Sequence, residues 1–157
     1  ALPDIQKLRA RHPTEELTMS DLRYEAPKTL AAAITLLKSA KGLSKVLAGG
    51  SDLLVQMKSG RLEPALLVDV KGIAGMTDIV TEKSGFRIGA ATPCMAVVEH
   101  KSFAKTWPGV TEAVALIGSI QVKGRASVGG NLCNGSPAAD SVPALIAAGA
   151  VASASFL

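Results

Sequence analysis

Two short glycine-rich segments are the residues best suited to bind a ligand. Residues 48–52 read Ala-Gly-Gly-Ser-Asp and residues 127–131 read Ser-Val-Gly-Gly-Asn, so each places two glycines beside a hydroxyl and an amide or carboxylate. Glycine lets backbone N–H groups approach a phosphate closely, and successive N–H groups in a turn form a concavity that binds anions. One such turn is weak evidence, but two in one small chain predict a ligand with two linked phosphates, held from both sides as in a dinucleotide.

The first segment lies between a predicted strand at 45–48 and a predicted helix at 53–58. The amino end of a helix carries a partial positive charge that favours phosphate. Ser51 can donate a hydrogen bond to a phosphate oxygen, whereas the charge of Asp52 makes it better suited to cap the helix or hold the loop. An ordinary strand–turn–helix connection is the alternative, because the spacing is neither that of a Walker loop nor that of a Rossmann fingerprint.

The second segment belongs to a stretch, 121–140, that holds Gly124, Gly129, Gly130 and Gly135 and few residues suited to regular structure. Long irregular stretches inside compact domains are usually functional. Ser127 and Asn131 can hydrogen-bond phosphate or ribityl groups. Asp140 can accept from a sugar hydroxyl or simply cap the helix that follows, and Lys123 and Arg125 are either close to an anion or solvated surface charges.

The sequence offers little for catalysis by its own side chains. Cys94 and Cys133 have no histidine near them in sequence, and no Ser-His-Asp set, catalytic carboxylate pair or metal-ligand spacing is apparent. If the chain takes part in chemistry, we therefore expect a cofactor to carry it. Two cysteines are too few for a disulfide framework, which favours a reducing compartment and a cytoplasmic location.

Composition limits the class of protein. The chain has 157 residues, of which 48% are hydrophobic and 3% aromatic, so we expect a globular domain with an aliphatic core. The net charge of +4 comes from scattered basic residues. This favours an anionic ligand or an acidic partner over nucleic acid, which would need a basic stripe. We expect no membrane span, and the absence of an initial Met and the end within an apolar run suggest part of a longer chain.

Helices and strands are mixed along the sequence. Apolar residues at helical spacing predict a helix at 29–40, and Pro93 and Pro108 each open a further one. We further expect a buried strand at 65–70, a hairpin formed by 77–81 and 86–90, a last helix at 143–150 and a final strand at 151–157. The mixture predicts an α+β domain or two small α/β lobes rather than a regular doubly wound sheet.

The chain resembles a known family in the order of its motifs. They are Leu-Arg-Tyr-Glu-Ala-Pro at 22–27, Ala-Gly-Gly-Ser-Asp-Leu at 48–53, Leu-Val-Asp-Val at 67–70, Ile-Gly-Ala at 88–90, Ser-Val-Gly-Gly-Asn at 127–131 and Ser-Pro-Ala-Ala-Asp at 136–140. This order is similar to that of the FAD-binding (medium) subunit of the molybdenum hydroxylases, the group of xanthine dehydrogenase, carbon monoxide dehydrogenase and aldehyde oxidase. The resemblance covers about residues 20–150.

The resemblance implies an α+β, two-lobed FAD-binding domain of the type shared by molybdenum hydroxylases and covalent-flavin oxidases, truncated in the second lobe. Residues 1–20 would form an N-terminal arm, 21–75 the first lobe and 76–157 the incomplete second lobe. By family analogy the residues that contact FAD are Val46, Leu47, Ala48, Gly49, Gly50, Ser51, Asp52, Leu53, Ile117, Ser127, Val128, Gly129, Gly130, Asn131 and Asp140.

The resemblance also implies a function. Electrons would pass from iron–sulfur clusters on a small partner subunit through FAD on this chain to NAD⁺, oxygen or another acceptor. A large partner subunit would carry the molybdenum cofactor, giving a hetero-oligomer. The alternatives are another FAD-dependent oxidoreductase of the same fold, or a non-catalytic fragment that binds a phosphate-bearing ligand.

Overall fold

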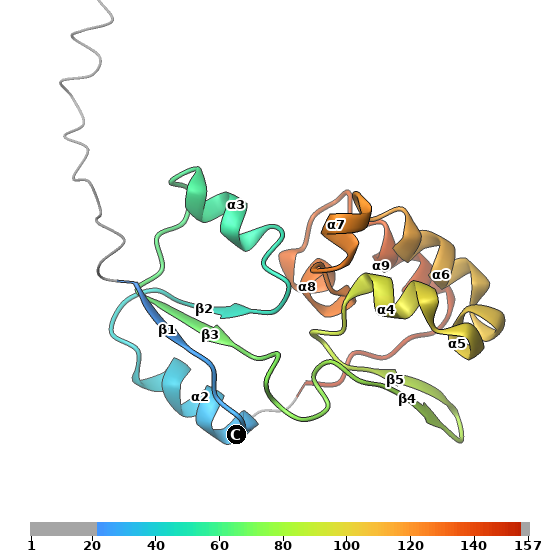
Figure 1. The fold of residues 1–157 in the computed structure, drawn as a ribbon, viewed down its shortest axis with the longest axis horizontal. Helices are drawn as coiled ribbons and strands as arrows, with labels where there is room; N and C mark the ends of the chain where they lie inside the picture. The colour runs from blue at the N-terminus through green and yellow to red at the C-terminus, as the bar shows by residue number, and fades with distance from the viewer. Residues whose placement is uncertain (1–21, 155–157) are drawn as a thin grey trace, which may run out of the picture.

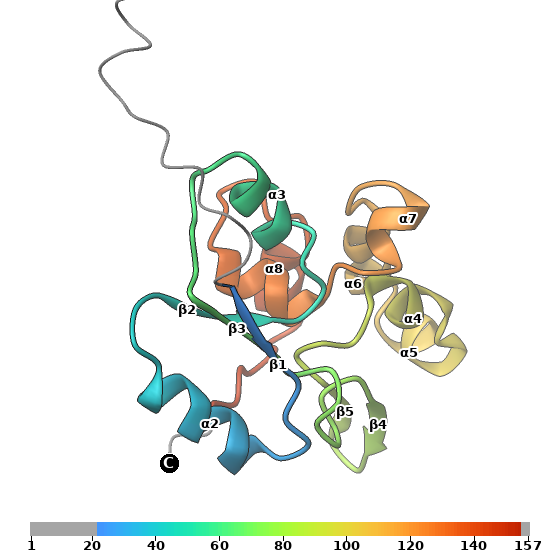
Figure 2. The same cartoon turned by 60° about the vertical axis from the view of Figure 1, so that its left-hand side comes forward.

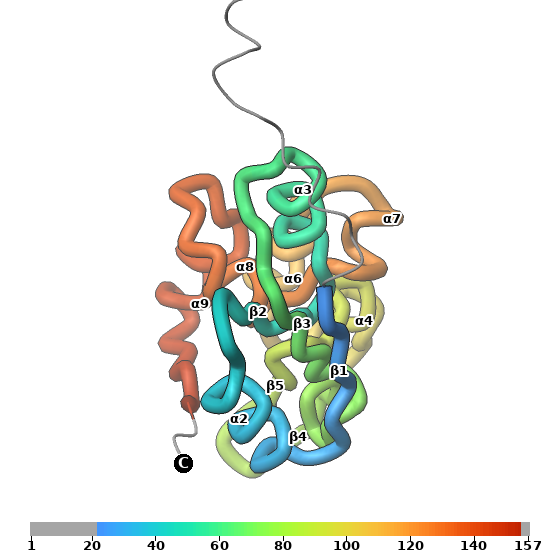
Figure 3. Tube along the Cα trace, turned by 90° about the vertical axis from the view of Figure 1, so that its left-hand side faces the viewer, coloured from blue at the N-terminus to red at the C-terminus, as the bar shows by residue number. Residues whose placement is uncertain are grey.

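The computed structural model describes residues 22–154. The predicted arm at 1–20 lies outside the described residues, as does the end of the predicted strand at 151–157. Figure 1 shows two parts side by side, a small sheet with its helices and a mainly helical part that carries a hairpin. Figure 3 looks from the side of the sheet, with the helical part behind it.

The first part is built on a three-stranded parallel sheet in the order β1-β3-β2. Its central strand reads Leu-Leu-Val-Asp and is buried at every position, the pattern of a parallel strand covered on both faces. Ala33 packs from the neighbouring helix into a core with Leu66 and Val68. The elements of this part are β1 (Arg23–Glu25), α2 (Leu30–Ser39), β2 (Ser44–Leu47), α3 (Leu53–Lys58) and β3 (Leu66–Asp69).

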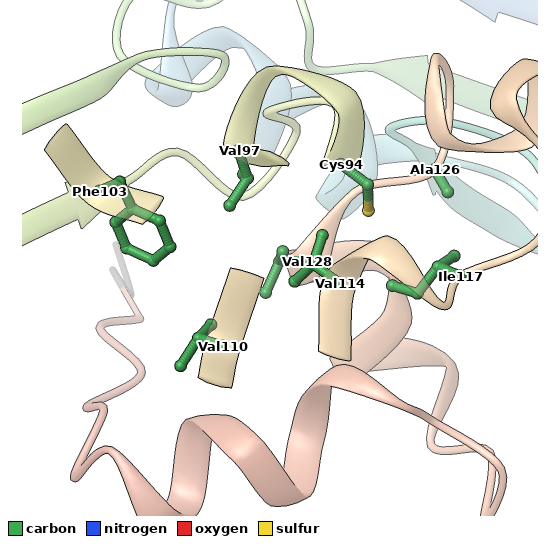
Figure 4. Packing of buried hydrophobic residues seen from close by; sticks show 8 residues of the cluster. All are labelled: Cys94, Val97, Phe103, Val110, Val114, Ile117, Ala126 and Val128. Carbon is green, nitrogen blue, oxygen red and sulfur yellow. The ribbon is translucent and has the colours of Figure 1, made fainter. Parts of the chain in front are cut away.

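The second part begins with an antiparallel hairpin and continues in short helices. Its elements are β4 (Ile79–Glu82), β5 (Gly85–Ile88), α4 (Cys94–Glu99), α5 (Lys101–Thr106), α6 (Pro108–Ala115), α7 (Ile120–Lys123), α8 (Val128–Asn134) and α9 (Ser141–Ala147). Its core, drawn in Figure 4, is aliphatic apart from Cys94 and Phe103, and the ring of Phe103 meets that of Phe86 edge-on at 5.3 Å between centroids. The cluster consists of Cys94, Val97, Phe103, Val110, Val114, Ile117, Ala126 and Val128.

Most of the predicted elements are confirmed. The helix at 29–40 is α2, which Thr29 caps by accepting a hydrogen bond from the Ala32 N–H. The hairpin forms with Ile79 opposite Ile88, and the helices predicted at Pro93 and Pro108 are α4 and α6. The sequence did not predict β1, α5 or α7, each of which is too short to show a clear period.

Two predictions were wrong. The second glycine segment is not irregular, because Val128–Asn134 is the helix α8. The described part of the predicted final strand, residues 151–154, has no regular structure. A strand needs a hydrogen-bonded neighbour to be stable, and none of the described residues pairs with this segment.

Among residues 22–154, no helix is both long and apolar enough to cross a membrane.

Candidate cofactor-binding site

The first glycine segment meets the backbone that directly precedes the second, although the two are far apart in the sequence. A Cβ atom added to Gly49 would lie 1.9 Å from the carbonyl oxygen of Arg125 and 2.9 Å from the Cα of Ala126. Only glycine allows this approach. In Figure 2 the turn between β2 and α3 and the helix α8 lie close together, and Gln56 on α3 donates to the side chain of Asn134 on α8 at 3.4 Å. The close approach predicted at Gly49 is therefore an approach to protein backbone.

The backbone donors of the first glycine turn are free. The Gly50 and Asp52 carbonyls accept from the N–H groups of Leu54 and Gln56 at 3.0 and 2.9 Å. In contrast, the N–H groups of residues 49–52 donate no hydrogen bond to any described residue. Gly50 has φ +78, a left-handed conformation that glycine adopts without strain. A row of unpaired N–H groups in such a turn is suited to an anion.

These free donors lie at a groove of about 520 Å³. Arg125 is the only charged residue that lines the groove among those the structure describes. The complete lining is Gly49, Gly50, Ser51, Leu54, Gln121, Val122 and Arg125, so the walls combine the glycine turn of the first part with apolar and polar residues of α3 and α7. The groove thus offers donors, one cation and apolar surface, which are the groups that a nucleotide cofactor requires.

A polar network holds the beginning of the first glycine turn. Lys71 Nζ donates to the Ala48 carbonyl and to Asp69 Oδ2, both at 2.8 Å, and the Tyr24 hydroxyl donates to the same carboxylate oxygen at 2.6 Å. Burial alone would raise the pKa of Asp69, but the hydrogen bonds from Lys71 and Tyr24 outweigh it and lower that pKa. The hydrogen bond to Asp69 raises the pKa of Tyr24.

The sequence did not predict that this network supports the site, because Tyr24 and Asp69 were recognised there only as members of two family motifs. Asp69 and Lys71 could have indicated it, because they are polar residues at and after the end of a buried apolar strand. Side chains at the carboxyl end of a parallel strand lie at the edge of the sheet where ligands bind.

In the second glycine segment, side-chain oxygens that were predicted to meet the ligand contact protein. Ser127 Oγ accepts from the Gly130 N–H at 3.0 Å and caps α8. Asn131 Oδ1 accepts from the Ser141 hydroxyl at 2.6 Å. A Cβ on Gly129 would lie 2.4 Å from the Ala90 carbonyl oxygen, whereas one on Gly130 would meet only Ser127 Oγ, at 3.0 Å. Gly129 is therefore required by packing against backbone, whereas a Cβ on Gly130 would press only on the side chain of Ser127.

The remaining predicted site residues differ in exposure. Leu47, Ile117 and Val128 are buried, Val46 is half-exposed and Leu53 is intermediate. Asp52 and Asp140 stand at the N-cap positions of α3 and α9 without a side-chain capping bond. The predicted capping by these two carboxylates is thus wrong, and both are exposed to solvent. Whether each of these residues contacts a cofactor stays a prediction.

The two cysteines have different surroundings. Cys94 is buried in the core of the second part, and burial raises its pKa to about 11, so its thiol is protonated at neutral pH. Cys133 is exposed. Among the described residues, no group of three or more His, Cys, Asp and Glu side chains is placed to hold a metal ion.

The fold and the groove define an α+β domain suited to a nucleotide cofactor. Residues 18–155 match the family described as the FAD binding domain in molybdopterin dehydrogenase, and the chain belongs to this family. The resemblance recognised in the sequence and the FAD-binding α+β fold that it implied are confirmed.

The chain is 35% identical over 125 residues to the xanthine dehydrogenase FAD-binding subunit of Escherichia coli O157:H7. It is 31% identical over 125 residues to the caffeine dehydrogenase subunit beta of Pseudomonas sp. (strain CBB1). These matches cover 78% and 80% of this chain and 42% of each relative, so the chain spans about two fifths of their length. The solved structure of reconstituted CO dehydrogenase from Oligotropha carboxidovorans is similar, with a TM-score of 0.72 and 32% identity over 76% of this chain and 42% of that one.

Proposed function

We propose that this chain holds FAD in a molybdenum hydroxylase, as part of the enzyme's electron-transfer subunit. The observation that carries the proposal is the row of free N–H groups at residues 49–52, which lies at a groove lined by Arg125. Free backbone donors together with one cation fit a diphosphate, and FAD joins its two halves through a diphosphate. Membership of the FAD-binding family supports the choice of this cofactor among dinucleotides.

In this proposal the chain's own residues bind and orient the cofactor. The first turn binds the diphosphate through its N–H groups, and Lys71 and Asp69 keep that turn in place through the Ala48 carbonyl. FAD supplies a redox centre that exchanges electrons singly or in pairs. The lobes 21–75 and 76–157 are part of the proposal, with these residues facing FAD: Val46, Leu47, Ala48, Gly49, Gly50, Ser51, Asp52, Leu53, Ile117, Ser127, Val128, Gly129, Gly130, Asn131 and Asp140.

The rest of the enzyme is proposed on the same basis. An iron–sulfur small subunit and a molybdenum-binding large subunit would be the partners in a cytoplasmic hetero-oligomer, and NAD⁺, oxygen or another molecule would be the final acceptor. The support is that relatives are named as FAD-binding or medium subunits of dehydrogenases that act on xanthine or carbon monoxide.

The test is an absorbance spectrum of the protein purified with the partners it retains, followed by denaturation and identification of the released cofactor. We expect non-covalent FAD together with iron–sulfur absorbance. A colourless protein that also fails to bind added FAD would contradict the proposal. FAD without iron–sulfur absorbance would retain the FAD site and reject the proposed partners.

A further inference from the structure

We infer that Arg125 supplies the positive charge that neutralises the diphosphate of the ligand, and that it makes the groove prefer ligands with two linked phosphates. This inference rests on the proposed function, and it adds a residue outside the set expected to contact FAD. The sequence left Lys123 and Arg125 as equal candidates for the neighbourhood of an anion. In the structure only Arg125 lines the groove, whereas Lys123 is hydrogen-bonded to backbone carbonyls.

Arg125 is fixed beside the first glycine turn. Its carbonyl oxygen is so close to Gly49 that a Cβ there would lie 1.9 Å away, and its own N–H donates to the Val122 carbonyl at 3.0 Å. Arg125 lines the same groove as Gly50 and Ser51. The guanidinium group therefore starts from a backbone that is packed against the turn bearing the free N–H groups.

The charge of Arg125 is also available. Among the described residues its guanidinium makes no ion pair and no hydrogen bond. Lys123 differs, because its Nζ donates to the Ala115 and Gly118 carbonyls at 2.9 and 3.2 Å, where α6 ends. Lys123 is thus a structural cation, and Arg125 is the free one at the groove.

A diphosphate needs such a cation. Both of its phosphates are ionised at neutral pH, and backbone N–H groups supply dipoles but no net charge. A guanidinium can bind two phosphate oxygens in parallel, with charge-assisted hydrogen bonds stronger than those between neutral groups. No acidic side chain is among the described residues that line the groove, where Arg125 is the one charged residue.

The experiment measures dissociation constants of FAD, ADP and adenosine by calorimetry, on the protein with the partners it retains and after removal of its cofactor. The variants are Arg125→Gln, Arg125→Lys and, as the matched control, Arg61→Gln. Arg61 is exposed and is not among the residues that line the groove, so its replacement changes the net charge equally. Thermal unfolding of each variant checks that the fold is retained.

We expect Arg125→Gln to weaken binding of FAD and ADP by roughly tenfold to hundredfold, the loss of a charge-assisted hydrogen bond. Arg125→Lys should recover part of the lost affinity, because lysine keeps the positive charge but cannot bind two phosphate oxygens in parallel. Adenosine should bind equally to all variants, and added salt should weaken FAD binding less in Arg125→Gln than in the wild type.

Equal FAD affinities in Arg125→Gln and Arg61→Gln would overturn the inference while leaving the proposed function intact. If the wild type binds ADP through Arg125 but does not bind FAD, the inference stands and the proposed function fails. Binding of none of these ligands would reject both.

Discussion

At the scale of single residues, Gly49 allows the backbones of the two parts of the molecule to touch, because it has no side chain. A Cβ at this position would overlap the Arg125 carbonyl, which is backbone and cannot rotate away as a side chain could. We expect Gly49→Ala to lower the free energy of unfolding by about 3 kcal/mol, as overpacking in a tight contact does. Urea unfolding measures the effect.

The matched control for this variant is Gly109→Ala. Gly109 lies in α6 with no atom within 4 Å of the added Cβ, so the substitution should stabilise the protein by about 0.5 kcal/mol. Equal effects of the two substitutions would show that the contact between Gly49 and Arg125 does not form in solution.

The network of Lys71, Asp69 and Tyr24 should give the protein an acid-sensitive stability. The pKa of Asp69 is lowered below 3.8, so the folded state binds its proton more weakly than the unfolded state does. The resulting stabilisation is present above pH 3.8 and is lost as the pH falls through the lower, folded-state pKa.

Lys71→Met should destabilise the protein by about 2 kcal/mol at neutral pH, because a buried carboxylate loses its cation. In this variant the acid-induced loss should be smaller, since without Lys71 the folded-state pKa of Asp69 rises toward its unfolded value and the two states bind the proton more equally. Unfolding measured from pH 3 to pH 7 tests this, and a pH profile parallel to that of the wild type would show that Lys71 does not interact with Asp69.

At the scale of elements, α8 forms although two of its first three residues are glycines. Ser127 accepts from the Gly130 N–H, and Val128 is buried in the core. We expect Ser127→Ala to destabilise the protein by about 1 kcal/mol through loss of the cap, and to speed hydrogen exchange at the beginning of α8. Ser127→Thr retains an oxygen that can cap. Unchanged exchange in Ser127→Ala would show that packing alone holds the helix.

The same helix shows what the sequence could and could not predict. The helix α2 and the strand β3 follow from apolar spacing, because Ala33 and Val68 are buried where the pattern requires. The segment that contains α8 looked irregular because glycine has a low helix propensity. Its stability comes from the cap and from the fit of Gly129 against Ala90, a contact between residues distant in sequence.

The candidate site, like the fold, was predictable only in part. Composition identified both glycine segments, because glycine and hydroxyl residues cluster there. The contact of Gly49 with Arg125 and the network of Lys71 with Ala48 were not predictable, because they depend on how the two parts pack and on the strand order β1-β3-β2. Local pattern identified the candidate segments, and only tertiary structure shows which of their backbone atoms have no partner among the described residues.

At the scale of the whole molecule, the junction between the two parts connects the groove to the core of the second part. The Cys94 N–H donates to the Ala126 carbonyl at 2.8 Å, and Ala126 is the residue whose Cα approaches Gly49. Cys94 is fully buried, with a pKa raised to about 11 by burial, so a thiol reagent reaches it only when this region opens. Its rate of modification therefore reports on opening of the junction.

We expect Cys133, which is exposed, to react with a maleimide in the native protein, while Cys94 reacts only slowly. A ligand that binds across the junction and not to the opened state suppresses opening by the factor 1 + [L]/Kd, so ADP at about 100 times its Kd should slow Cys94 modification about hundredfold. Peptide mapping by mass spectrometry in the Cys133→Ser variant measures this rate, with the denatured protein as the control in which Cys94 reacts freely. If saturating ADP leaves the Cys94 rate unchanged, ligand binding is not coupled to the junction, and the ligand contacts only one of the two parts.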